Sequence, residues 1–127
     1  TVDDLGHLHR GGRISKTTAV IGSMINIKPI LHINAAGQLV PLTTVRGRKK
    51  SLITICNLMM DSIGKYKDDE DVICIAHGDA YEDALYLKEL LLERLPHKKI
   101  MINTVSPSIG AHSGPGAIGI CYMGEIR

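Results

Sequence analysis

A chain of 127 residues is the size of one domain, and 44% hydrophobic with 22% charged residues is an ordinary globular composition that excludes a disordered chain. The formal net charge of +2 is too balanced for nucleic-acid binding through bulk charge. No run approaches the roughly 18 apolar residues of a membrane span, and the first residues lack a secretory pattern, so we expect a cytoplasmic protein.

The three cysteines favour the same reducing compartment. Cys56, Cys74 and Cys121 lie far apart in apolar segments and show no C-x-x-C spacing. We therefore predict three buried, reduced thiols. Phe and Trp are absent from the sequence, so Ile, Leu, Val and Met are expected to form an aliphatic core.

Two short helices are predicted at the start of the chain. Thr1 is the candidate N-cap of the first, which Gly11 and Gly12 end. Ser15 is the candidate N-cap of the second, which ends near Asn26.

A β-hairpin is predicted next. Residues 27–34 and 39–45 are rich in β-branched side chains, and a short Gly-containing turn at 35–38 separates them. Pro29 and Pro41 each remove one backbone donor, so they belong near a strand start, on an edge or at a bulge.

The remaining pattern alternates helices and strands. It predicts a helix at 47–63, a strand at 72–76, a helix at 81–94 ended by Pro96, a strand at 100–105, a loop at 106–116 and a strand at 117–123. The fold class is therefore α/β, with a mixed β-sheet of about five strands and helices packed on it. We expect one domain over residues 1–127.

The loop at 106–116 is the first candidate site. The spacing G-x-G-x-x-G at 114–119 does not indicate a dinucleotide site, because that fingerprint must open a helix of a βαβ unit, whereas a strand is predicted here, and too few residues remain for an acidic ribose ligand. Several glycine amides around the imidazole of His112 and the hydroxyl of Ser113 suit a small anion such as a carboxylate. The alternative is a turn that needs glycine, with His112 merely polar surface.

Two basic segments are further candidates. Arg13 follows two glycines and could bind a carboxylate or phosphate, although it could equally be a cation at a helix C-terminus. Arg46, Arg48 and the two lysines after it put four cations at the start of a helix, against the helix dipole. They could bind phosphate or an acidic partner, or could form a solvated basic face.

No catalytic or metal motif accompanies these segments. The six histidines and three cysteines have no zinc spacing, so we predict no metal site. G-x-S-x-G is absent, and Ser113 beside His112 has no evident acidic partner. We expect no enzyme and no cofactor; the competing hypothesis is a phosphotransferase or hydrolase that uses His112 and Arg13.

Five segments together resemble one family. They read GGRIS at 11–15, IGSMINIKPIL at 21–31, VRGRKK at 45–50, IAHGD at 75–79 and IGAHSGPGAIG at 109–119. Their order and wording resemble the C-terminal half of DegV-family proteins along nearly the whole chain. The resemblance implies a two-domain α/β protein of bacteria that buries one long-chain fatty acid between its domains and presents it to a fatty-acid kinase.

The resemblance also implies roles for single residues. His112 would lie near the acyl carboxylate or acyl phosphate with Arg13 beside the same mouth, and Arg46 would face the kinase, with Arg48 in the same basic segment. The side chains that could line the acyl tail are equally ordinary core residues: Met24, Ile27 and Ile30.

The resemblance also implies that an N-terminal domain, which grips the carboxyl in relatives, is missing from this sequence. We therefore expect half a site, weak lipid binding by this chain alone, and an exposed apolar face through which the fragment could self-associate. The alternative function is a protein–protein interaction domain that uses the basic face at 46–50 without lipid.

Overall fold

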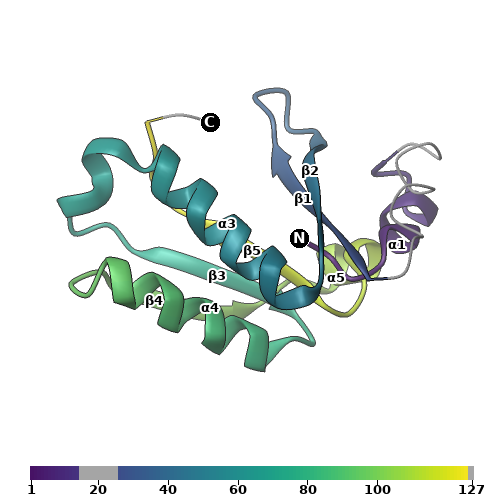
Figure 1. The fold of residues 1–127 in the computed structure, drawn as a ribbon. Coiled ribbons are helices and arrows are strands. Elements are labelled where there is room, and N and C mark those ends of the chain that lie inside the picture. The colour runs from purple at the N-terminus through teal and green to yellow at the C-terminus, as the bar shows by residue number, and fades with distance from the viewer. Residues whose placement is uncertain (15–25, 126–127) are drawn as a thin grey trace.

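The computed structural model describes residues 1–14 and 26–125 (Figure 1). The elements in chain order are α1 (Leu5–Arg10), β1 (Ile27–Ile33), β2 (Leu39–Arg46), α3 (Arg48–Ser62), the 3-10 helix η1 (Gly64–Asp68), β3 (Ile73–Gly78), α4 (Tyr81–Arg94), β4 (Ile100–Thr104), α5 (Pro107–Ser113) and β5 (Ala117–Cys121). The helix predicted from Ser15 and the tail residue Met24 lie outside the described residues.

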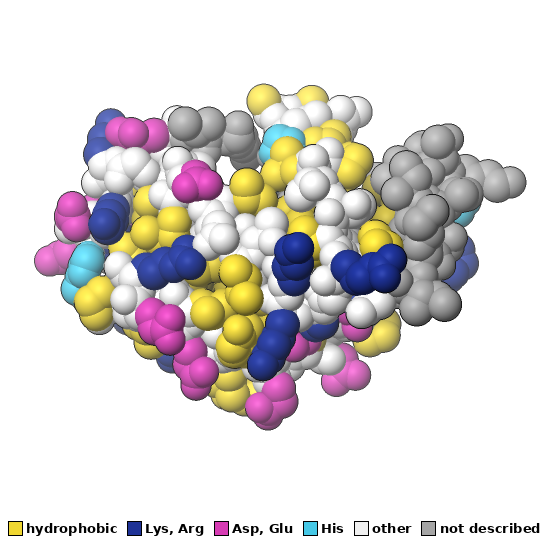
Figure 2. Space-filling model, in the orientation of Figure 1, with side chains coloured by type: hydrophobic (Ala, Val, Ile, Leu, Met, Phe, Trp, Pro, Cys, Tyr) yellow, Lys and Arg dark blue, Asp and Glu magenta, His cyan; other side chains and the backbone are white. Residues whose placement is uncertain are grey.

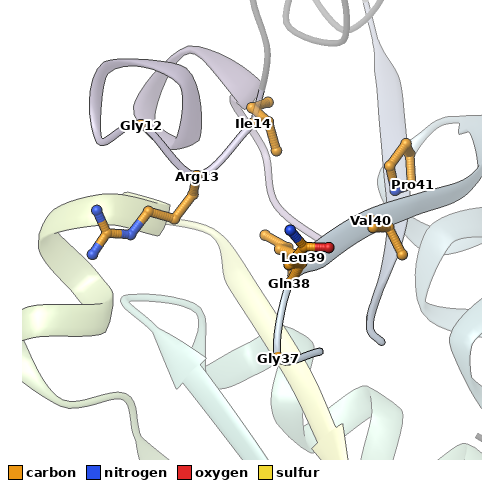
Figure 3. Close-up of a pocket in the computed structure, with 8 residues that line it drawn as sticks. All are labelled: Gly12, Arg13, Ile14, Gly37, Gln38, Leu39, Val40 and Pro41. Atoms are coloured by element: carbon orange, nitrogen blue, oxygen red, sulfur yellow. The ribbon is translucent and has the colours of Figure 1, made fainter. Parts of the chain in front are cut away.

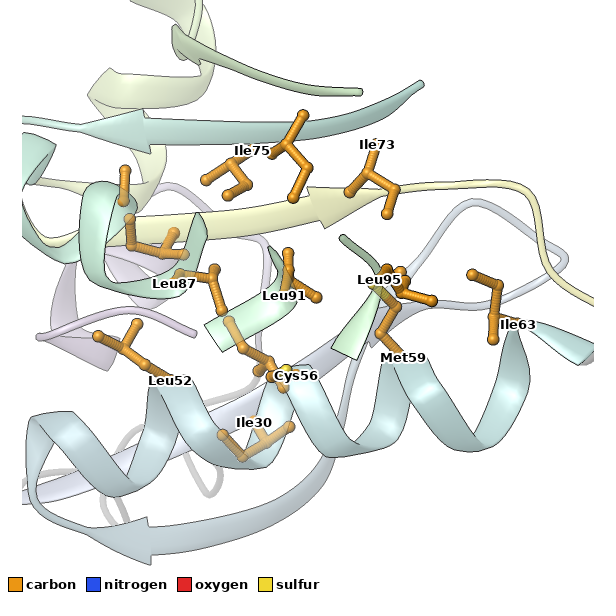
Figure 4. Packing of buried hydrophobic residues seen from close by; sticks show 14 residues of the cluster. Ile30, Leu52, Cys56, Met59, Ile63, Ile73, Ile75, Leu87, Leu91 and Leu95 are labelled. Atoms are coloured by element: carbon orange, nitrogen blue, oxygen red, sulfur yellow. The ribbon is translucent and has the colours of Figure 1, made fainter. Parts of the chain in front are cut away.

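The α/β class and the five strands are confirmed, but the strands form two sheets instead of one. β3 is the central strand of the larger sheet, in the order β4-β3-β5, parallel to β4 and antiparallel to β5. β1 and β2 form a separate antiparallel hairpin. α3 lies between the hairpin and the three-stranded sheet, so the hairpin packs on a helix and does not reach a sheet edge (Figures 1 and 4).

The core is aliphatic, as the composition predicts. Side chains from α3, α4, β3 and the hairpin meet in one cluster (Figure 4). Its fully buried members include Ile30, Leu52, Met59, Ile73, Ile75, Leu87, Leu91 and Leu95. Ile30 is 1% exposed and packs in this cluster, so the structure gives it the position of a core residue.

The hairpin matches its prediction. The side-chain oxygen of Asn34 accepts hydrogen bonds from the backbone N–H groups of Ala36 and Gln38, which fixes the turn. The register shifts by one residue where Leu31 pairs with Pro41, so this proline lies at a β-bulge.

The first helix begins later than predicted, and Thr1 is not its N-cap. Asp4 caps α1, and its carboxylate accepts from the backbone N–H of Gly6 at 2.7 Å. The nitrogen of Thr1 instead donates to the carbonyl of Ile118, and the Ile118 N–H donates back to the Thr1 carbonyl, both at 2.9 Å. These reciprocal bonds draw Thr1 into the edge of the sheet and away from the helix.

The segment predicted as a loop at 106–116 contains helix α5. The Ser106 hydroxyl accepts from the Ile109 N–H, Pro107 occupies the first turn, and Gly114 ends the helix. The glycine and proline content concealed a helix whose cap, first turn and end follow the usual preferences.

The prediction of three buried thiols holds for Cys56 and is wrong for Cys121. Cys56 is buried, Cys74 is partly buried and Cys121 is exposed. On β3, Ile73 and Ile75 point into the core, so Cys74 between them points to the opposite face. The apolar run at 72–76 predicted a strand covered on both faces, whereas burial along β3 alternates.

The buried Lys98, in the loop between α4 and β4, binds the segment formed by η1 and the residue after it. The Nζ of Lys98 donates to the backbone carbonyls of Tyr66 at 2.7 Å and Asp69 at 2.8 Å, and it pairs with the Asp69 carboxylate. The hydrogen bond from Lys98 holds the pKa of Asp69 below its ordinary value of 3.8.

We predict an acid-sensitive contribution from this pair. A carboxylate whose pKa is lowered on folding stabilises the protein above its ordinary pKa, and this stabilisation is lost as the pH falls below that value. Urea unfolding between about pH 5 and pH 2 should therefore show a steeper loss of stability in the wild type than in Asp69→Asn. Asp68→Asn, which keeps the ion pair, should retain the wild-type slope; equal slopes in all three proteins would contradict the assignment.

Candidate functional site

Two predicted ligand-binding residues meet at the end of α1. Arg13 donates from Nη1 to the carbonyl of Gly11 at 2.6 Å. The imidazole of His112 on α5 lies against the same residue, so a Cβ added at Gly11 would be 2.5 Å from its Nδ1. Gly11 therefore lets a guanidinium and an imidazole approach one peptide, and we name Gly11, Arg13 and His112 the mouth.

A second histidine and glycine hold α1 to α5. A Cβ added at Gly114 would be 2.7 Å from Cγ of His7, whose Nδ1 lies 3.3 Å from a carboxylate oxygen of Asp4. Each helix thus presents a histidine to a glycine associated with the other. His7 was not among the predicted site residues, because its role depends on a contact with α5 that the spacing of the histidines does not indicate.

Ser113, the third residue predicted for this site, is buried and bonded within its own helix. Its hydroxyl donates to the carbonyl of Ile109 at 2.8 Å. While that bond holds, the hydroxyl proton of Ser113 is already used, so the side chain can only accept a hydrogen bond. A carboxylate also only accepts, so Ser113 cannot bind it in this state.

A pocket of about 450 Å³ adjoins the mouth (Figure 3). It lies between the loop after α1 and the hairpin, and its lining is Gly12, Arg13, Ile14, Gly37, Gln38, Leu39, Val40 and Pro41. Figure 3 shows Ile14 turned toward Leu39, while the guanidinium of Arg13 extends the other way, toward α5. Arg13 therefore belongs to both the pocket wall and the mouth.

The pocket lining differs from the residues predicted for an acyl tail. Ile27 is at the start of β1, opposite Arg46, and Ile30 points into the core. The pocket uses Leu39 and Val40 at the start of β2 instead. These two residues were predicted only as part of a strand. Their position next to the hairpin turn was the one feature of the sequence that could have indicated a place in the pocket lining.

The two arginines of the basic segment have different surroundings. Arg46 is exposed at the end of β2. Arg48 bonds from Nε to the Asp83 carboxylate at 2.8 Å, and its Nη1 lies 3.4 Å from the Asp3 carboxylate, which also pairs with Lys28.

These acids explain why α3 tolerates a cation at its N-terminus. Asp83, in the first turn of α4, and Asp3 offset the unfavourable dipole term at Arg48. The exposed part of the basic segment is Arg46 with Lys49 and Lys50, and Figure 2 shows basic side chains beside a hydrophobic area on the face that carries α3 and the hairpin.

The described part of the chain offers neither a metal-binding cluster nor a membrane-spanning helix. Within 1–14 and 26–125, no three or more His, Cys, Asp or Glu side chains are arranged to hold a metal ion. None of the helices described in those ranges is long and apolar enough to cross a membrane.

Fold and site together define a class: an α/β domain in which a basic, glycine-lined mouth adjoins an open pocket with a mixed polar and apolar lining. The DegV family model, described as an uncharacterised protein family, matches residues 1–125. The chain belongs to the DegV family, as its motifs indicate.

Three bacterial relatives illustrate the match. A DegV domain-containing protein of Clostridium perfringens is 42% identical over the whole chain, which covers 43% of that protein. The crystal structure of DegV from Bacillus subtilis, a fatty-acid-binding protein, shares 38% identity and a TM-score of 0.73, over 94% of this chain and 42% of the other. The fatty acid kinase B3 protein of Streptococcus pneumoniae was solved with linoleic acid bound and shares the fold, with a TM-score of 0.80 at 22% identity. That match covers 92% of this chain and 40% of the other. The chain therefore spans less than half the length of these relatives.

Proposed function

We propose that this chain forms part of a fatty-acid-binding protein, with the carboxylate at the mouth and part of the acyl chain in the adjoining pocket. The observation that carries the proposal is that Arg13 and His112 both contact Gly11 beside a pocket whose lining includes Ile14, Leu39 and Val40. The pocket has a volume of about 450 Å³ and is open to solvent, so it could hold only part of a ligand without a further cover.

The chemistry of the mouth suits a carboxylate or an acyl phosphate. A guanidinium carries five N–H donors, and the bond to the Gly11 carbonyl uses only part of them. Charge-assisted hydrogen bonds to a carboxylate are about twice as strong as neutral ones. Arg13 would fix the head group, and the apolar side chains Ile14, Leu39 and Val40 would contact the chain beyond it.

The remainder of a DegV protein would complete the site. The relatives are more than twice as long as this chain, which covers 43% of the Clostridium perfringens protein. We propose that the remaining part supplies the principal carboxyl grip and covers the pocket. On its own, this chain would bind fatty acid weakly.

The same proposal includes a partner enzyme. A bound acyl carboxylate would be converted to acyl phosphate by a fatty-acid kinase, and this chain would carry the ligand without catalysing the step. Arg46 is exposed at the junction of β2 and α3, where a docked kinase could contact it. The Streptococcus pneumoniae protein with the same fold supports this reading.

The test is ligand identification followed by two substitutions. Mass spectrometry of organic extracts of the purified full-length protein should reveal a long-chain fatty acid. Arg13→Ala and His112→Asn should each weaken fatty-acid binding at least tenfold, because one hydrogen bond to a charged group contributes roughly 1.5–3 kcal/mol and about 1.4 kcal/mol is tenfold in affinity. Arg10→Ala is the matched control, because Arg10 is an exposed cation on α1 that pairs with Asp4.

Two results would contradict the proposal. One is a full-length protein that neither carries nor takes up fatty acid. The other is an equal loss of affinity in Arg10→Ala, which would indicate a general charge effect instead of a defined mouth.

A second candidate function rests on the exposure of Arg46 and its neighbours. They could bind an acidic protein without any lipid. Binding would then weaken with added salt and with Arg46→Ala, and would be indifferent to fatty acid. Arg48→Ala is less informative, because Arg48 is bonded to Asp83 within the domain.

A further inference from the structure

Three sulfur-bearing side chains stand in one row across the larger sheet. Cys74 on β3 is directly opposite Met101 on β4, and it is also directly opposite Cys121 on β5. Residues directly opposite each other in a sheet point to the same face. The register therefore places two thiols and one thioether side by side.

The row lies on the face turned away from the core. Ile73 and Ile75 are 2% and 0% exposed on the helix-covered face, so Cys74 between them points to the other. Met101 is 49% exposed and Cys121 is exposed. Solvent and small ions can therefore reach the row.

Backbone hydrogen bonds fix the spacing of the two thiols. Thr1 and Ile118 exchange both of their backbone bonds, so the N–H and C=O of Ile118 point away from β3. These groups alternate in direction along a strand, so those of Cys121 point toward β3. Cys74 and Cys121 are therefore a hydrogen-bonded pair, with Cα atoms about 5.5 Å apart.

The Cα separation alone is compatible with a disulfide, but the Cβ separation favours a bridging ion. A disulfide needs Cβ atoms about 3.8 Å apart, whereas opposite residues in a hydrogen-bonded pair have theirs near 5.5 Å. Two metal–thiolate bonds of about 2.3 Å hold sulfur atoms up to about 4.6 Å apart, which the wider pair can supply. Thiolate and thioether donors suit soft metals such as Cu(I) and Zn²⁺. Structural zinc almost always takes four protein ligands, so a set of two thiolates and one thioether fits Cu(I) better.

We propose that Cys74, Cys121 and Met101 form a binding site for monovalent copper on the open face of the sheet. Each thiol releases one proton, and Cu⁺ takes two thiolates and one thioether, which gives a complex of net charge −1. No electron is transferred. The site is separate from the lipid mouth and does not depend on the proposed function.

The experiment is an anaerobic titration of the purified protein with Cu(I) against a chromophoric chelator such as bicinchoninate. We expect one equivalent of tightly held copper in the wild type. Cys74→Ser and Cys121→Ser should each lower the affinity at least tenfold, and Met101→Leu should lower it by less. The controls Cys56→Ala, which removes the buried core thiol, and Met60→Leu, on α3, should bind as the wild type does.

Two outcomes would overturn the proposal. One is copper affinity that survives Cys74→Ser or is lost in Cys56→Ala, because either result places the metal elsewhere. The other is a metal-free protein in which, after exposure to air, two thiols no longer react with a thiol reagent and the molecular mass is lower by two hydrogen atoms. That result would mean that Cys74 and Cys121 form a disulfide.

Discussion

The Leu87→Ala variant is expected to lose about 3 kcal/mol of unfolding free energy, because truncating a fully buried leucine removes apolar contacts and leaves a cavity. Leu87 is 0% exposed and lies in the cluster between α3, α4 and the three-stranded sheet (Figure 4). Whole domains are stable by only about 5–15 kcal/mol, so this single change should shift the urea midpoint substantially.

The matched control removes the same atoms from a half-exposed position. Leu42 is 50% exposed on β2, and Leu42→Ala should change the unfolding free energy by about 0.5 kcal/mol or less. Urea unfolding followed by circular dichroism measures both variants. Similar losses in the two would show that Leu87 does not occupy the core position assigned to it.

Local sequence signals predicted most of the elements. The helix at 81–94 was predicted with the observed bounds, because leucine periodicity defines its buried face and Pro96 prevents its continuation. The hairpin was predicted from two β-branched runs and a turn that contains Gly37. Such signals depend only on neighbouring residues, so they can be read before the chain is folded.

Tertiary arrangement was less accessible. Nothing in the hairpin sequence states that α3 separates it from the other strands, so one sheet was predicted where two exist. Threonine is a residue type that is preferred at helix N-caps, yet the reciprocal backbone hydrogen bonds between Thr1 and Ile118 place Thr1 at a sheet edge. Those outcomes depend on segments distant in sequence, which local propensity does not describe.

The candidate site shows the same division. Glycine next to Arg13 and glycines around His112 indicated two places where anions could bind. Arg13 and His112 both contact Gly11 because α1 packs against α5, and the spacing of residues along the sequence does not reveal that packing. The resemblance to DegV proteins had brought Arg13 and His112 to one mouth, and the packing supplies a physical reason for their proximity.

That packing leads to the second large prediction: Gly114→Ala should lower the unfolding free energy by about 3 kcal/mol, combining backbone strain with a steric clash. Gly114 has φ 73° and ψ 177°, a conformation that is essentially restricted to glycine. The added Cβ would also be 2.7 Å from Cγ of His7, well inside a normal contact. Because α1 would have to move, and Arg13 with it, fatty-acid binding should weaken as well.

Two other glycines separate the strain from the clash. Gly37 has φ 77° with open space around it, so Gly37→Ala should cost about 1 kcal/mol through strain alone. Gly119 has neither a positive φ nor a neighbour within 4 Å, so Gly119→Ala should change stability by about 0.5 kcal/mol or less. Urea unfolding of the three variants should rank Gly114→Ala well below the others.

A double substitution then locates the clash at His7. If the imidazole is the obstacle, adding His7→Ala to Gly114→Ala should recover the steric part of the loss and leave a cost close to that of Gly37→Ala. The two changes would be non-additive, as expected for side chains in direct contact. Simple additivity would mean that His7 and Gly114 do not meet, and the packing that brings Arg13 to His112 would need a different explanation.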